Sequence, residues 1–453
     1  MPDQDVQTVE QRLAALFEHL GLERAHFGVQ NTAERDPIIA GQPERIASMA
    51  MAGLNRLQAA TVAPIADRLL LMYGDGGAGV DAIAASLPAL PEVERHCFKD
   101  YVVLTWSDVA ADRGGEIVPL WLDFLGRAEA RNPASQPRIA PCEGDGEGGG
   151  EVTGEVSGIT YRVRGSGTAL VLLPMLLSAS QWEPIIERLA EYYCVISLGG
   201  RYLGGVGFID GRGTDPGYLR GVHMHINEIN IQPGETVLDV GCGPGSLDRW
   251  LARHTQGANP ITAVDVNGYF LREAAAIAEA EGLSDSISFG PGNAEDLPFP
   301  DNSFDVVMSH TVMEECDAEL MLAEMIRVAK PGGRVAVMVR AVDMRSLWNL
   351  PLSAAIKAKV EAPVPSVGAK GCADASLYSR FGRSGLTDLK LFPTTMTVSD
   401  PDGYTWKYYE PYLFSMLDAD ETAQWHAAKA QAIADKSILL ARWLHCAVGT
   451  KAG

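Results

Sequence analysis

Apolar positions along the chain form short continuous runs, separated by stretches in which they recur at helical spacing. In the first third the order is LAALFEHLG, AHFGV, RIASMAMAG, RLLLMYGD and EIVPLWLDFLG. Further on come three strand-like runs, ITYRVRG, ALVLLP and YCVISLG, with the helical pattern SQWEPIIERLAEYY between the last two. A second alternation begins at Tyr218 and continues to the C-terminus. Short apolar runs that alternate with helices are typical of an α/β fold with a parallel sheet.

A stretch rich in Pro, Gly and acidic residues interrupts this pattern between Arg131 and Gly158, and it includes RNPASQPRIAPCEGDGEGGGEVTGE. Because large apolar side chains are displaced there, we predict a linker at residues 131–157. The linker divides the chain into segments 1–130, 158–205 and 206–453. A chain of 453 residues has room for two domains, each with its own core.

Charge and composition exclude several classes of function. Lys and Arg number 37 against 58 Asp and Glu, and the net charge of −21 would repel a polyanion, so we expect no nucleic acid partner. The N-terminus lacks the basic start and apolar core of a signal peptide. No apolar run approaches the roughly 20 residues of a membrane span. These features predict a cytoplasmic protein with no membrane partner.

The seven cysteines are odd in number and dispersed, and they lack CxxC or Cys/His spacing. They predict reduced thiols rather than disulfides or a zinc site. We therefore expect no metal.

A glycine-rich turn lies within ETVLDVGCGPGSLDRWLARHT. We predict a buried strand at Val237–Val240, a turn with glycines at 241, 243 and 245, and then a helix. Glycines in such a turn let the backbone approach a ligand more closely than a Cβ permits. The turn alone does not identify the ligand, because dinucleotide-binding proteins have a similar strand, turn and helix, and likewise an acid about 20 residues later.

Three further features favour a ligand with an amino-acid part over a dinucleotide. The spacing is GxGxG preceded by Asp239. The run ITAVDVN places Asp265 at the end of the next strand, where a carboxylate can accept hydrogen bonds from both ribose hydroxyls. One helix and strand later, FGPGNAEDLPFPDNSFDVVMSHTVMEE places Asn293 and Ala294 where an adenine edge would be read.

Taken together, LDVGCGPG, NAEDLPFPDNSFDVV and RVAKPGGRVAVMV resemble the class I methyltransferases related to the ubiquinone and menaquinone biosynthesis enzymes. The resemblance covers Tyr218 to Arg340 well, and it implies a Rossmann-like domain with S-adenosylmethionine as cofactor. Asn293 stands where the family more often has Asp, and an amide oxygen can still accept the adenine hydrogen bond. The resemblance implies that the cofactor contacts are Asp239, Gly241, Cys242, Gly243 and Gly245 at the methionine part, Asp265 and Val266 at the ribose, and Asn293, Ala294, Glu295 and His310 nearby.

Methyl transfer from a sulfonium is an in-line displacement, so the protein must chiefly hold the acceptor and exclude water. In a doubly wound sheet the acceptor sits beyond the carboxyl ends of the central strands, which points to His310 and Arg340. His310 is the candidate base, because an imidazole titrates near neutrality. Glu314 could orient His310 or bind a cationic acceptor, although such acids also suit a helix N-terminus.

Further candidate acceptor contacts lie before and after this core. His223 and His225 are two residues apart, so they diverge by roughly 200° on a helix and cannot readily share a metal; one could face the cleft. An insertion at residues 341–381 stands where a substrate cover belongs. The aromatics of DGYTWKYYEPYLF could wall an aromatic or isoprenoid acceptor, or simply pack an edge strand. The acceptor candidates are Tyr218, His223, Arg340, Tyr378, Tyr404 and Trp406.

The segments on either side of the linker resemble an α/β-hydrolase in swapped order. LFEHLGLERAHFGVQNTAERDPIIAGQPERIASMAMAG resembles the stretch through the nucleophile elbow, whereas ITYRVRGSGTALVLLPMLLSASQWEPIIERLAEYYCVISLG resembles the first strands. This order indicates a circular permutation, or two half-domains completed by a second chain, so a homodimer stays open. Without a nucleophile and its base we expect an inactive scaffold. The catalytic positions hold Asn31, Gly77 and Val103, and the oxyanion-hole position holds Pro174 and Met175.

The leading hypothesis is a small-molecule methyltransferase with an inactive hydrolase-like accessory domain. A regulatory protein that senses S-adenosylmethionine without turnover is the alternative from another class. Cys316 and Cys372 also raise an arsenite-methylating enzyme, because paired thiolates bind that metalloid. A nicotinamide-dependent oxidoreductase shares only the glycine turn and the ribose acid.

Overall fold

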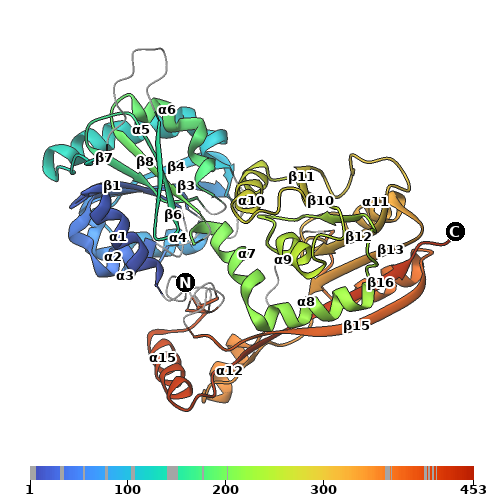
Figure 1. Ribbon diagram of the computed structural model, residues 1–453. Coiled ribbons are helices and arrows are strands. Elements are labelled where there is room, and N and C mark those ends of the chain that lie inside the picture. The colour runs from blue at the N-terminus through green and yellow to red at the C-terminus, as the bar shows by residue number, and fades with distance from the viewer. Residues whose placement is uncertain are drawn as a thin grey trace. The chain divides into compact units, whose positions relative to one another are not determined.

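The structure is a computed structural model of the 453-residue chain (Figure 1). The chain divides into two compact units, residues 1–207 and 208–453, and each is described by itself. The residues described are 7–30, 35–54, 57–76, 80–103, 108–139, 151–175, 178–200, 202–362, 368, 370–401, 406, 409–410, 413–414 and 416–453.

Unit 1, residues 1–207, is built on one eight-stranded sheet of order β4-β3-β2-β1-β7-β8-β6-β5. The strands from β4 to β8 are parallel, whereas β6 is antiparallel to β8 and β5 to β6. Since β1 pairs with β7, segments from both sides of the predicted linker share one sheet within this chain. The strands are β1 (Ala25–Val29), β2 (Ile46–Leu54), β3 (Leu69–Gly76), β4 (Glu94–Val102), β5 (Val152–Val156), β6 (Ile159–Arg164), β7 (Ala169–Leu172) and β8 (Cys194–Gly199).

The central strands of this sheet explain the apolar runs in the sequence. Every residue of β1, β2, β7 and β8 is buried, as expected where helices cover both faces of parallel strands. The strand-like runs ITYRVRG, ALVLLP and YCVISLG are confirmed as strands, and the apolar runs AHFGV, RIASMAMAG and RLLLMYGD also lie on strands. The edge strand β4 is half-exposed and therefore has no continuous apolar run.

Helices cover both faces of the sheet of unit 1 (Figure 1). The apolar faces of α5 and α6 pack into one core, and that of α1 packs into the other. α1 begins with a capping box of Thr8 and Gln11 and ends at Gly21 in the left-handed conformation. The helices are α1 (Val9–Leu20), α2 (Arg35–Gly41), α3 (Ala59–Val62), α4 (Val80–Ser86), α5 (Val109–Arg131) and α6 (Glu183–Ala190), with short 3-10 turns η1 (Pro43–Arg45), η2 (Ala63–Arg68), η3 (Leu87–Ala89) and η4 (Ala179–Trp182).

One boundary of the predicted linker was wrong. β5 begins at Val152, inside the predicted stretch 131–157, and forms a hairpin with β6. Ser157 and Gly158 turn the hairpin with φ of 52° and 77°, which suits the tight turns of antiparallel strands. Residues along β5 are alternately exposed and half-buried, so the strand lacks the apolar run that would have predicted it.

Unit 2, residues 208–453, is built on a sheet of order β11-β10-β9-β12-β13-β16-β14, with β15 paired to β16. β9 to β13 are parallel and β16 is antiparallel to its neighbours. The chain order reverses between β9 and β12, which opens a crevice at their carboxyl ends. The strands are β9 (Val237–Val240), β10 (Ile261–Asp265), β11 (Ile287–Pro291), β12 (Phe304–His310), β13 (Ala329–Arg340), β14 (Leu347–Trp348), β15 (Thr387–Val398) and β16 (Leu440–Thr450).

Helices also cover both faces of this second sheet (Figure 1). α8 and α9 pack on one face, and α11 and α13 on the other. α8 approaches β15 closely at Gly217, where an added Cβ would lie 1.6 Å from the carbonyl oxygen of Thr397. The helices are α7 (Gly204–Thr214), α8 (Pro216–Ile229), α9 (Ser246–His254), α10 (Gly268–Ala280), α11 (Ala318–Val328), α12 (Ala354–Val360), α13 (Ser376–Arg383) and α15 (Ala419–Ala434).

A cluster of three buried tryptophans packs beside α12 and α15. The ring of Trp348 lies 4.8 Å from that of Trp406 and 5.0 Å from that of Trp425, centroid to centroid. This cluster holds part of the predicted insertion 341–381 in the core of unit 2.

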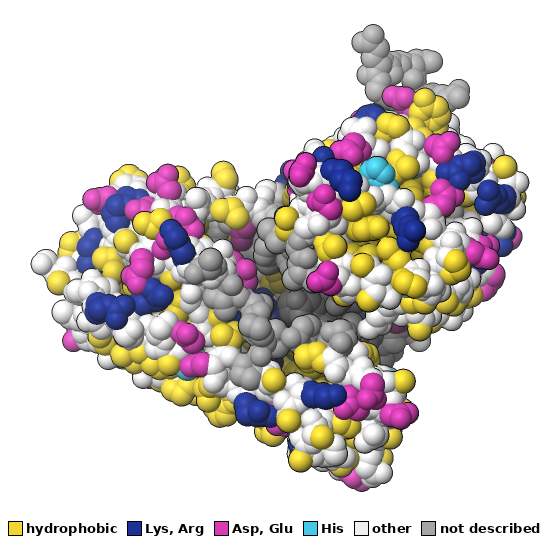
Figure 2. All heavy atoms as spheres, turned by 180° about the vertical axis from the view of Figure 1, so that it is seen from behind, with side chains coloured by type: hydrophobic (Ala, Val, Ile, Leu, Met, Phe, Trp, Pro, Cys, Tyr) yellow, Lys and Arg dark blue, Asp and Glu magenta, His cyan; other side chains and the backbone are white. Residues whose placement is uncertain are grey.

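The sequence predicts no membrane span and no nucleic acid partner, and the described residues bear on both expectations. No helix among them is long and apolar enough to cross a membrane. On the face shown in Figure 2, Lys and Arg side chains are dispersed among Asp and Glu side chains. That face therefore offers no continuous basic surface for a polyanion.

Candidate functional site

The glycine turn lies where β9 ends and α9 begins. Gly241, Gly243 and Gly245 have φ of 81°, 56° and 72°, a region that favours glycine. A Cβ on Gly241 would lie 2.2 Å from Cγ2 of Val312, so packing requires that glycine. A Cβ on Gly243 would meet only Cδ1 of Ile209, at 3.7 Å. The turn is therefore tightly packed on one side and open to a ligand on the other.

Asp265 ends β10 beside this turn. Its Oδ2 accepts a hydrogen bond from the amide of Gly243, and its Oδ1 accepts one from the amide of Asn267, both at 2.8 Å. Burial raises the pKa of Asp265, whereas the backbone bonds oppose that rise. Each of the two carboxylate oxygens retains one lone pair, so Asp265 can accept hydrogen bonds from two further donors. The structure thus brings the predicted acid to the predicted turn.

Two buried carboxylates, Asp239 on β9 and Asp248 on α9, lie under the turn. Asp239 is 3% and Asp248 0% exposed, and Oδ1 of Asp239 and both oxygens of Asp248 have no hydrogen-bond partner among the described residues. Burial raises the pKa of both groups, to about 7 for Asp248, and the negative charge of each neighbour raises that of Asp239 further. Buried carboxylates without donors favour a cationic ligand.

The charge of Arg249 lowers the pKa of Asp248, but its guanidinium makes its contacts elsewhere. Its guanidinium pairs with Asp210 on α7, lies 2.9 Å from Glu281 and donates to the carbonyl of Pro244 at 2.7 Å. These contacts fasten the glycine turn to α7 and to the end of α10. Arg249 is therefore a structural clamp on the turn.

His310 lies at the carboxyl end of β12 and packs against α8. Its Nε2 is 3.1 Å from Nδ1 of His225, and the two ring centroids are 5.1 Å apart at 76°. Burial lowers the pKa of both imidazoles, to about 4 for His225. The next residue, Thr311, has φ of 57° and donates its amide to the carbonyl of Met338 at 2.7 Å. Such a conformation in a β-branched residue is strained, which is common at functional sites.

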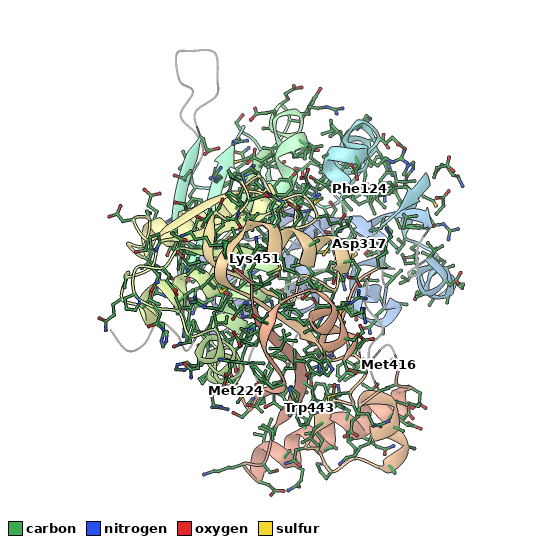
Figure 3. All side chains as sticks on the ribbon, turned by 90° about the vertical axis from the view of Figure 1, so that its right-hand side faces the viewer. Phe124, Met224, Asp317, Met416, Trp443 and Lys451 are labelled. Carbon is green, nitrogen blue, oxygen red and sulfur yellow. The ribbon has the colours of Figure 1, made fainter. Side chains whose placement is uncertain are left out.

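The buried Glu314 and the half-buried Arg340 form an ion pair across the ends of β12 and β13. Oε1 of Glu314 accepts from the Arg340 amide at 2.7 Å and lies 3.4 Å from its Nε, and Glu315 holds Nη2 at 2.9 Å. Burial raises the pKa of Glu314, and Arg340 opposes the rise. Glu314 is therefore not a helix N-terminal acid, because α11 is capped by Asp317, whose side chain is labelled in Figure 3.

Tyr218 lies on α8 and faces this group of residues. It is 6% exposed, and the guanidinium of Arg212 lies 5.5 Å from its ring centroid. Burial raises its pKa, Arg212 opposes the rise, and the carboxylates of Asp239 and Glu314 add to it. These interactions bring Tyr218, an acceptor candidate, close to Arg212, Asp239 and Glu314.

The predicted adenine contacts follow β11. Asn293 forms an isolated bridge with Asp296, and its Oδ1 accepts from the Glu295 amide at 3.0 Å. Ala294 is 7% exposed, whereas Val266 after β10 is 74% exposed. Cys242 is buried and its thiol lies 3.6 Å from the carbonyl oxygen of Gly243. These residues border the turn and the end of β10.

Two predicted acceptor contacts are corrected by the structure. His223 is exposed on α8 beside Trp250 and His254, and the next residue, Met224, is also exposed (Figure 3). His225, on the opposite side of the helix, is the histidine that meets His310. Trp406 is 0% exposed and packs within the tryptophan cluster of the core.

Of the remaining acceptor candidates, the structure describes Tyr378 but not Tyr404. Tyr378 on α13 is half-buried, and its hydroxyl lies 2.8 Å from Nδ1 of His445, whose Nε2 lies 2.8 Å from Asp343. Tyr404 lies outside the described residues. Tyr378 therefore pins the insertion to β16.

Sequence reasoning chose His223 in place of His225, and it missed Asp248. His225 follows Tyr218 by seven residues, which is two helical turns, so both fall on one face. Asp248 shares the apolar face of α9 with Leu251 and Ala252, and an acid on an apolar face is a signal of a buried site.

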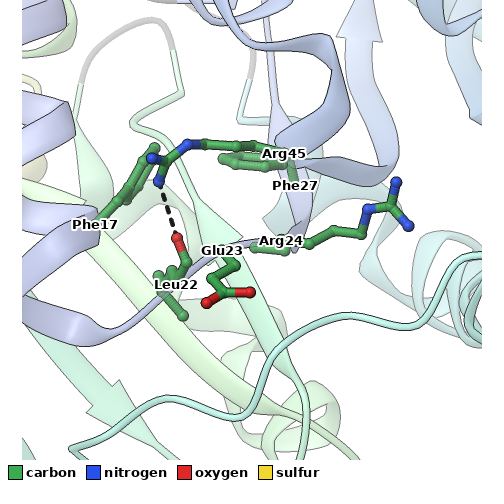
Figure 4. Close-up of a pocket in the computed structure, with 7 residues that line it drawn as sticks. Phe17, Leu22, Glu23, Arg24, Phe27 and Arg45 are labelled. Carbon is green, nitrogen blue, oxygen red and sulfur yellow. Dashed lines mark hydrogen bonds between the residues drawn. The ribbon is translucent and has the colours of Figure 1, made fainter.

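Two hollows in unit 1 offer no comparable chemistry. In the recess of Figure 4, Nη1 of Arg45 donates to the carbonyl of Leu22 at 3.0 Å, and no room for a water molecule is left. A wider surface groove is lined by Ala84, Leu87, Pro88, Leu90, Pro91, Val93 and Arg95, which supply no nucleophile and no carboxylate.

Part of this chain is similar to known proteins. Residues 238–337 match the family model described as a methyltransferase domain. The chain is 40% identical over 127 residues to the sterol 24-C-methyltransferase ERG6B of Gibberella zeae, which covers 28% of this chain and 33% of that protein. It is 32% identical over 145 residues to the ubiquinone/menaquinone biosynthesis C-methyltransferase UbiE of Hahella chejuensis, which covers 30% of this chain and 58% of that protein. The chain thus spans between one third and three fifths of the length of these relatives.

A solved structure, the YcgJ protein from Bacillus subtilis, aligns with 52% of this chain and 99% of its own, at 16% identity and a TM-score of 0.37.

Proposed function

We propose that this chain, whose residues 238–337 form a methyltransferase domain, is an enzyme that transfers the methyl group of S-adenosylmethionine to a small-molecule acceptor. The observation that carries the proposal is the hydrogen bond between the Gly243 amide and Asp265. It joins a glycine turn fit for an amino-acid moiety to an acid fit for a ribose, at the crevice where the strand order reverses.

The residues present fit such a donor. S-adenosylmethionine supplies, when bound, a methyl group on a positively charged sulfur. The open side at Gly243 gives room for its methionine part, and the orphaned oxygens of Asp239 and Asp248 suit a cationic group. Asp265 holds the two ribose hydroxyls through the remaining lone pair of each oxygen.

The other donor contacts border these residues. The exposed side chain of Val266 supplies an apolar surface for the ring system. Asn293, Ala294 and Glu295 stand beside the adenine, and Asn293 accepts from its amino group with a lone pair of the amide oxygen.

The acceptor binds on the other side of the crevice. Tyr218 and His310 approach it from α8 and β12, and the Glu314–Arg340 pair closes the end of β13. His310 accepts a proton where the acceptor must lose one, and the insertion 341–381, pinned by Tyr378, excludes water. An aromatic or isoprenoid acceptor is the preferred class.

Unit 1 is the inactive hydrolase-like scaffold. If residues 152–199 are read ahead of residues 9–131, the strands run 1-2-4-3-5-6-7-8 across the sheet, which supports a circular permutation within one chain. Val103 follows the edge strand β4, and Pro174 and Met175 follow β7, so no base or oxyanion-hole glycine stands at these positions. Asn31 and Gly77 lie outside the described residues.

Two alternatives make different demands on the chain. A sensor of S-adenosylmethionine would bind the donor without turnover and would leave His310 and Arg340 unused. An arsenite enzyme needs accessible thiolates, whereas Cys372 is 1% exposed and burial raises the pKa of Cys316 to about 12. Cys316 is therefore protonated and Cys372 is inaccessible, so the two are poorly suited to a metalloid.

Calorimetry with S-adenosylmethionine tests the proposal, followed by a search for S-adenosylhomocysteine release over a panel of phenolic, quinoid and isoprenoid acceptors. We expect binding by the full chain, loss of binding in Gly243→Val, and release with at least one acceptor. The exposed-site variant Met224→Ala is the matched control. Wild-type protein that binds no donor would contradict the proposal, and donor binding with no release from any acceptor would favour the sensor.

A further inference from the structure

Several buried polar atoms at the crevice of unit 2 lack a hydrogen-bond partner among the described residues. Asp239 and Asp248 carry such oxygens at the end of β9 and in the first turn of α9, and the segment that ends β12 carries two further atoms, Nδ1 of His310 and Oε2 of Glu314. Since most buried polar groups in proteins are paired, this group of atoms indicates a polar ligand. Asp239 and Asp248 suit the cationic donor, which leaves Oε2 of Glu314 for the acceptor.

Only one half of the Glu314 carboxylate is bound by the protein. Its Oε1 accepts from the amide of Arg340 at 2.7 Å and from Nε of Arg340 at 3.4 Å, whereas Oε2 has no partner. The side chain of Glu314 is 0% exposed, so bulk water does not reach Oε2. A buried carboxylate oxygen without a donor is costly, and a ligand that donates a hydrogen bond to it removes that cost.

The charges around Glu314 restrict which group can donate. An ionised carboxylate only accepts hydrogen bonds. Arg340 already balances the charge of Glu314, and Glu315, which binds Nη2 of Arg340 at 2.9 Å, is 43% exposed to solvent. A cationic group would add a charge that no further buried group balances, and it would share the crevice with the positive sulfur of the donor. A neutral hydroxyl donates without adding charge.

The insertion 341–381 covers the loop that carries Glu314. The amide of Gly368 donates to the carbonyl of Glu314 at 2.8 Å, and the amide of Cys372 donates to the carbonyl of Met313 at 2.9 Å. Both bonds lie beyond the carboxyl end of β12, outside the ladder that joins β12 to β13. Entry of an acceptor beside Glu314 therefore separates loop contacts and leaves the sheet intact.

We infer that Glu314 is a specificity-determining residue, whose Oε2 accepts a hydrogen bond from a neutral hydroxyl group of the methyl acceptor. The inference rests on the proposed methyl transfer, and it narrows the acceptor to an alcohol or a phenol. The hydroxyl keeps its proton, so the contact orients the acceptor and takes no part in bond making or breaking. An acceptor without the hydroxyl leaves Oε2 buried and unpaired, and a site built in this way rejects it.

Matched probes test the inference on the full-length protein loaded with S-adenosylhomocysteine, which has no methyl group to transfer. One set is benzyl alcohol, benzyl methyl ether and benzylamine, and the other is geraniol, geranyl methyl ether and geranylamine. Ligand-observed NMR gives the dissociation constants. We expect each alcohol to bind roughly 10- to 150-fold more tightly than its ether, and more tightly than its protonated amine. Equal constants for alcohol and ether, as expected if a buried water satisfies Oε2, would overturn the inference, as would a preference for the amine or the failure of both alcohols to bind.

Two glutamine variants separate Glu314 from its neighbour. Glu314→Gln keeps the size of the side chain and the contact with the Arg340 amide, but it places an NH₂ group where Oε2 stood. That group donates equally to a hydroxyl oxygen or an ether oxygen, so alcohol and ether should bind with about equal affinity. Glu315→Gln removes a charge from the same arginine on its exposed side, and it should keep the preference for the alcohol. A preference that survives in Glu314→Gln, or that is lost in Glu315→Gln, would overturn the role of Glu314.

Calorimetry on the same samples distinguishes this inference from the proposed function. Wild-type protein that binds neither S-adenosylmethionine nor S-adenosylhomocysteine would remove the proposed function, although the probes could still be compared on the unloaded protein. Normal cofactor binding with no preference for the alcohols would remove only the role of Glu314. The comparison within the wild type needs no variant, so it decides the inference even where Glu314→Gln fails to fold.

Discussion

The amide of Gly243 donates to Oδ2 of Asp265 at 2.8 Å and so ties the turn after β9 to the end of β10. The amide of Asn267 occupies the other oxygen in the same way. A single carboxylate thus fixes the turn and the following loop before any ligand arrives. Since preorganised donors and acceptors cost less ordering on binding, this arrangement favours donor affinity.

Replacing Asp265 with Ala should weaken donor binding. The change removes charged hydrogen bonds to the ribose, and the loss of even one, worth about 1.5–3 kcal/mol, predicts roughly 10- to 150-fold weaker S-adenosylmethionine binding. Calorimetry measures the change, and 5′-methylthioadenosine, which keeps the ribose but lacks the amino acid, should weaken by a similar factor. Asp285→Ala, at an exposed acid after α10, is the control. Unchanged affinity for both ligands would contradict the role of Asp265.

Replacing Gly241 with Ala should destabilise unit 2. The new Cβ would lie 2.2 Å from Cγ2 of Val312, which is a steric clash. The φ of 81° would also strain a residue that carries a side chain. We expect a loss of about 2–4 kcal/mol in the free energy of unfolding. Gly234 has φ of 88° and nothing within 4 Å, so Gly234→Ala should cost only about 1 kcal/mol. Chemical denaturation of both variants gives the difference, and equal losses would show that the clash with Val312 is relieved.

Replacing Asp248 with Asn should change how stability depends on pH. Burial raises the pKa of Asp248 in the folded chain to about 7, from 3.8. The folded state then holds a proton that the unfolded state releases, so ligand-free wild-type protein loses stability as the pH rises from 3.8 to about 7. An amide cannot ionise, so the variant should lose less stability as the pH rises. It should therefore melt at a higher temperature than the wild type at pH 8. Thermal unfolding across this range measures it, and parallel curves would contradict the prediction.

Much of unit 2 could be predicted because its signals are local. The strand at Val237–Val240, the glycines and Asp265 lie within about 30 residues, and each depends on backbone freedom or burial that a short stretch reveals. The same holds for the fully buried strands of unit 1.

The rest depends on contacts between distant segments. Which of His223 and His225 faces His310 is set by the rotation of α8 against β15, where Gly217 lets the backbones touch. Glu314 was weighed as a helix N-terminal acid, but its partner Arg340 is 26 residues away. Trp406 was assigned to a cleft because clustered aromatics suit both a wall and a core, and only the packing against Trp348 decides between them.

A serine, a histidine and a glutamate do meet in unit 1, although not at the hydrolase positions. Nδ1 of His26 lies 2.8 Å from Oγ of Ser48, and Nε2 lies 2.7 Å from Oε2 of Glu129. His26 and Ser48 are 0% exposed, and they lie near the start of β1 and β2 rather than in the loops beyond the carboxyl ends. No substrate carbonyl can reach that hydroxyl, so the contacts are structural.

Ser48 should therefore resist a fluorophosphonate probe, and small activated esters should not be hydrolysed. Ser48→Ala leaves a ring nitrogen of His26 without a partner, which should cost about 1–3 kcal/mol in unfolding free energy. Burial lowers the pKa of His26 despite the opposing bond to Glu129. Below pH 6.5 the unfolded state binds a proton at His26 that the folded state does not. The contribution of neutral His26 to stability is therefore complete above pH 6.5 and is lost as the pH falls below it. Mass spectrometry after labelling, with a known serine hydrolase in the same tube, measures reactivity. A labelled Ser48, with esterase activity abolished in Ser48→Ala, would show that unit 1 opens to substrate and is not an inert scaffold.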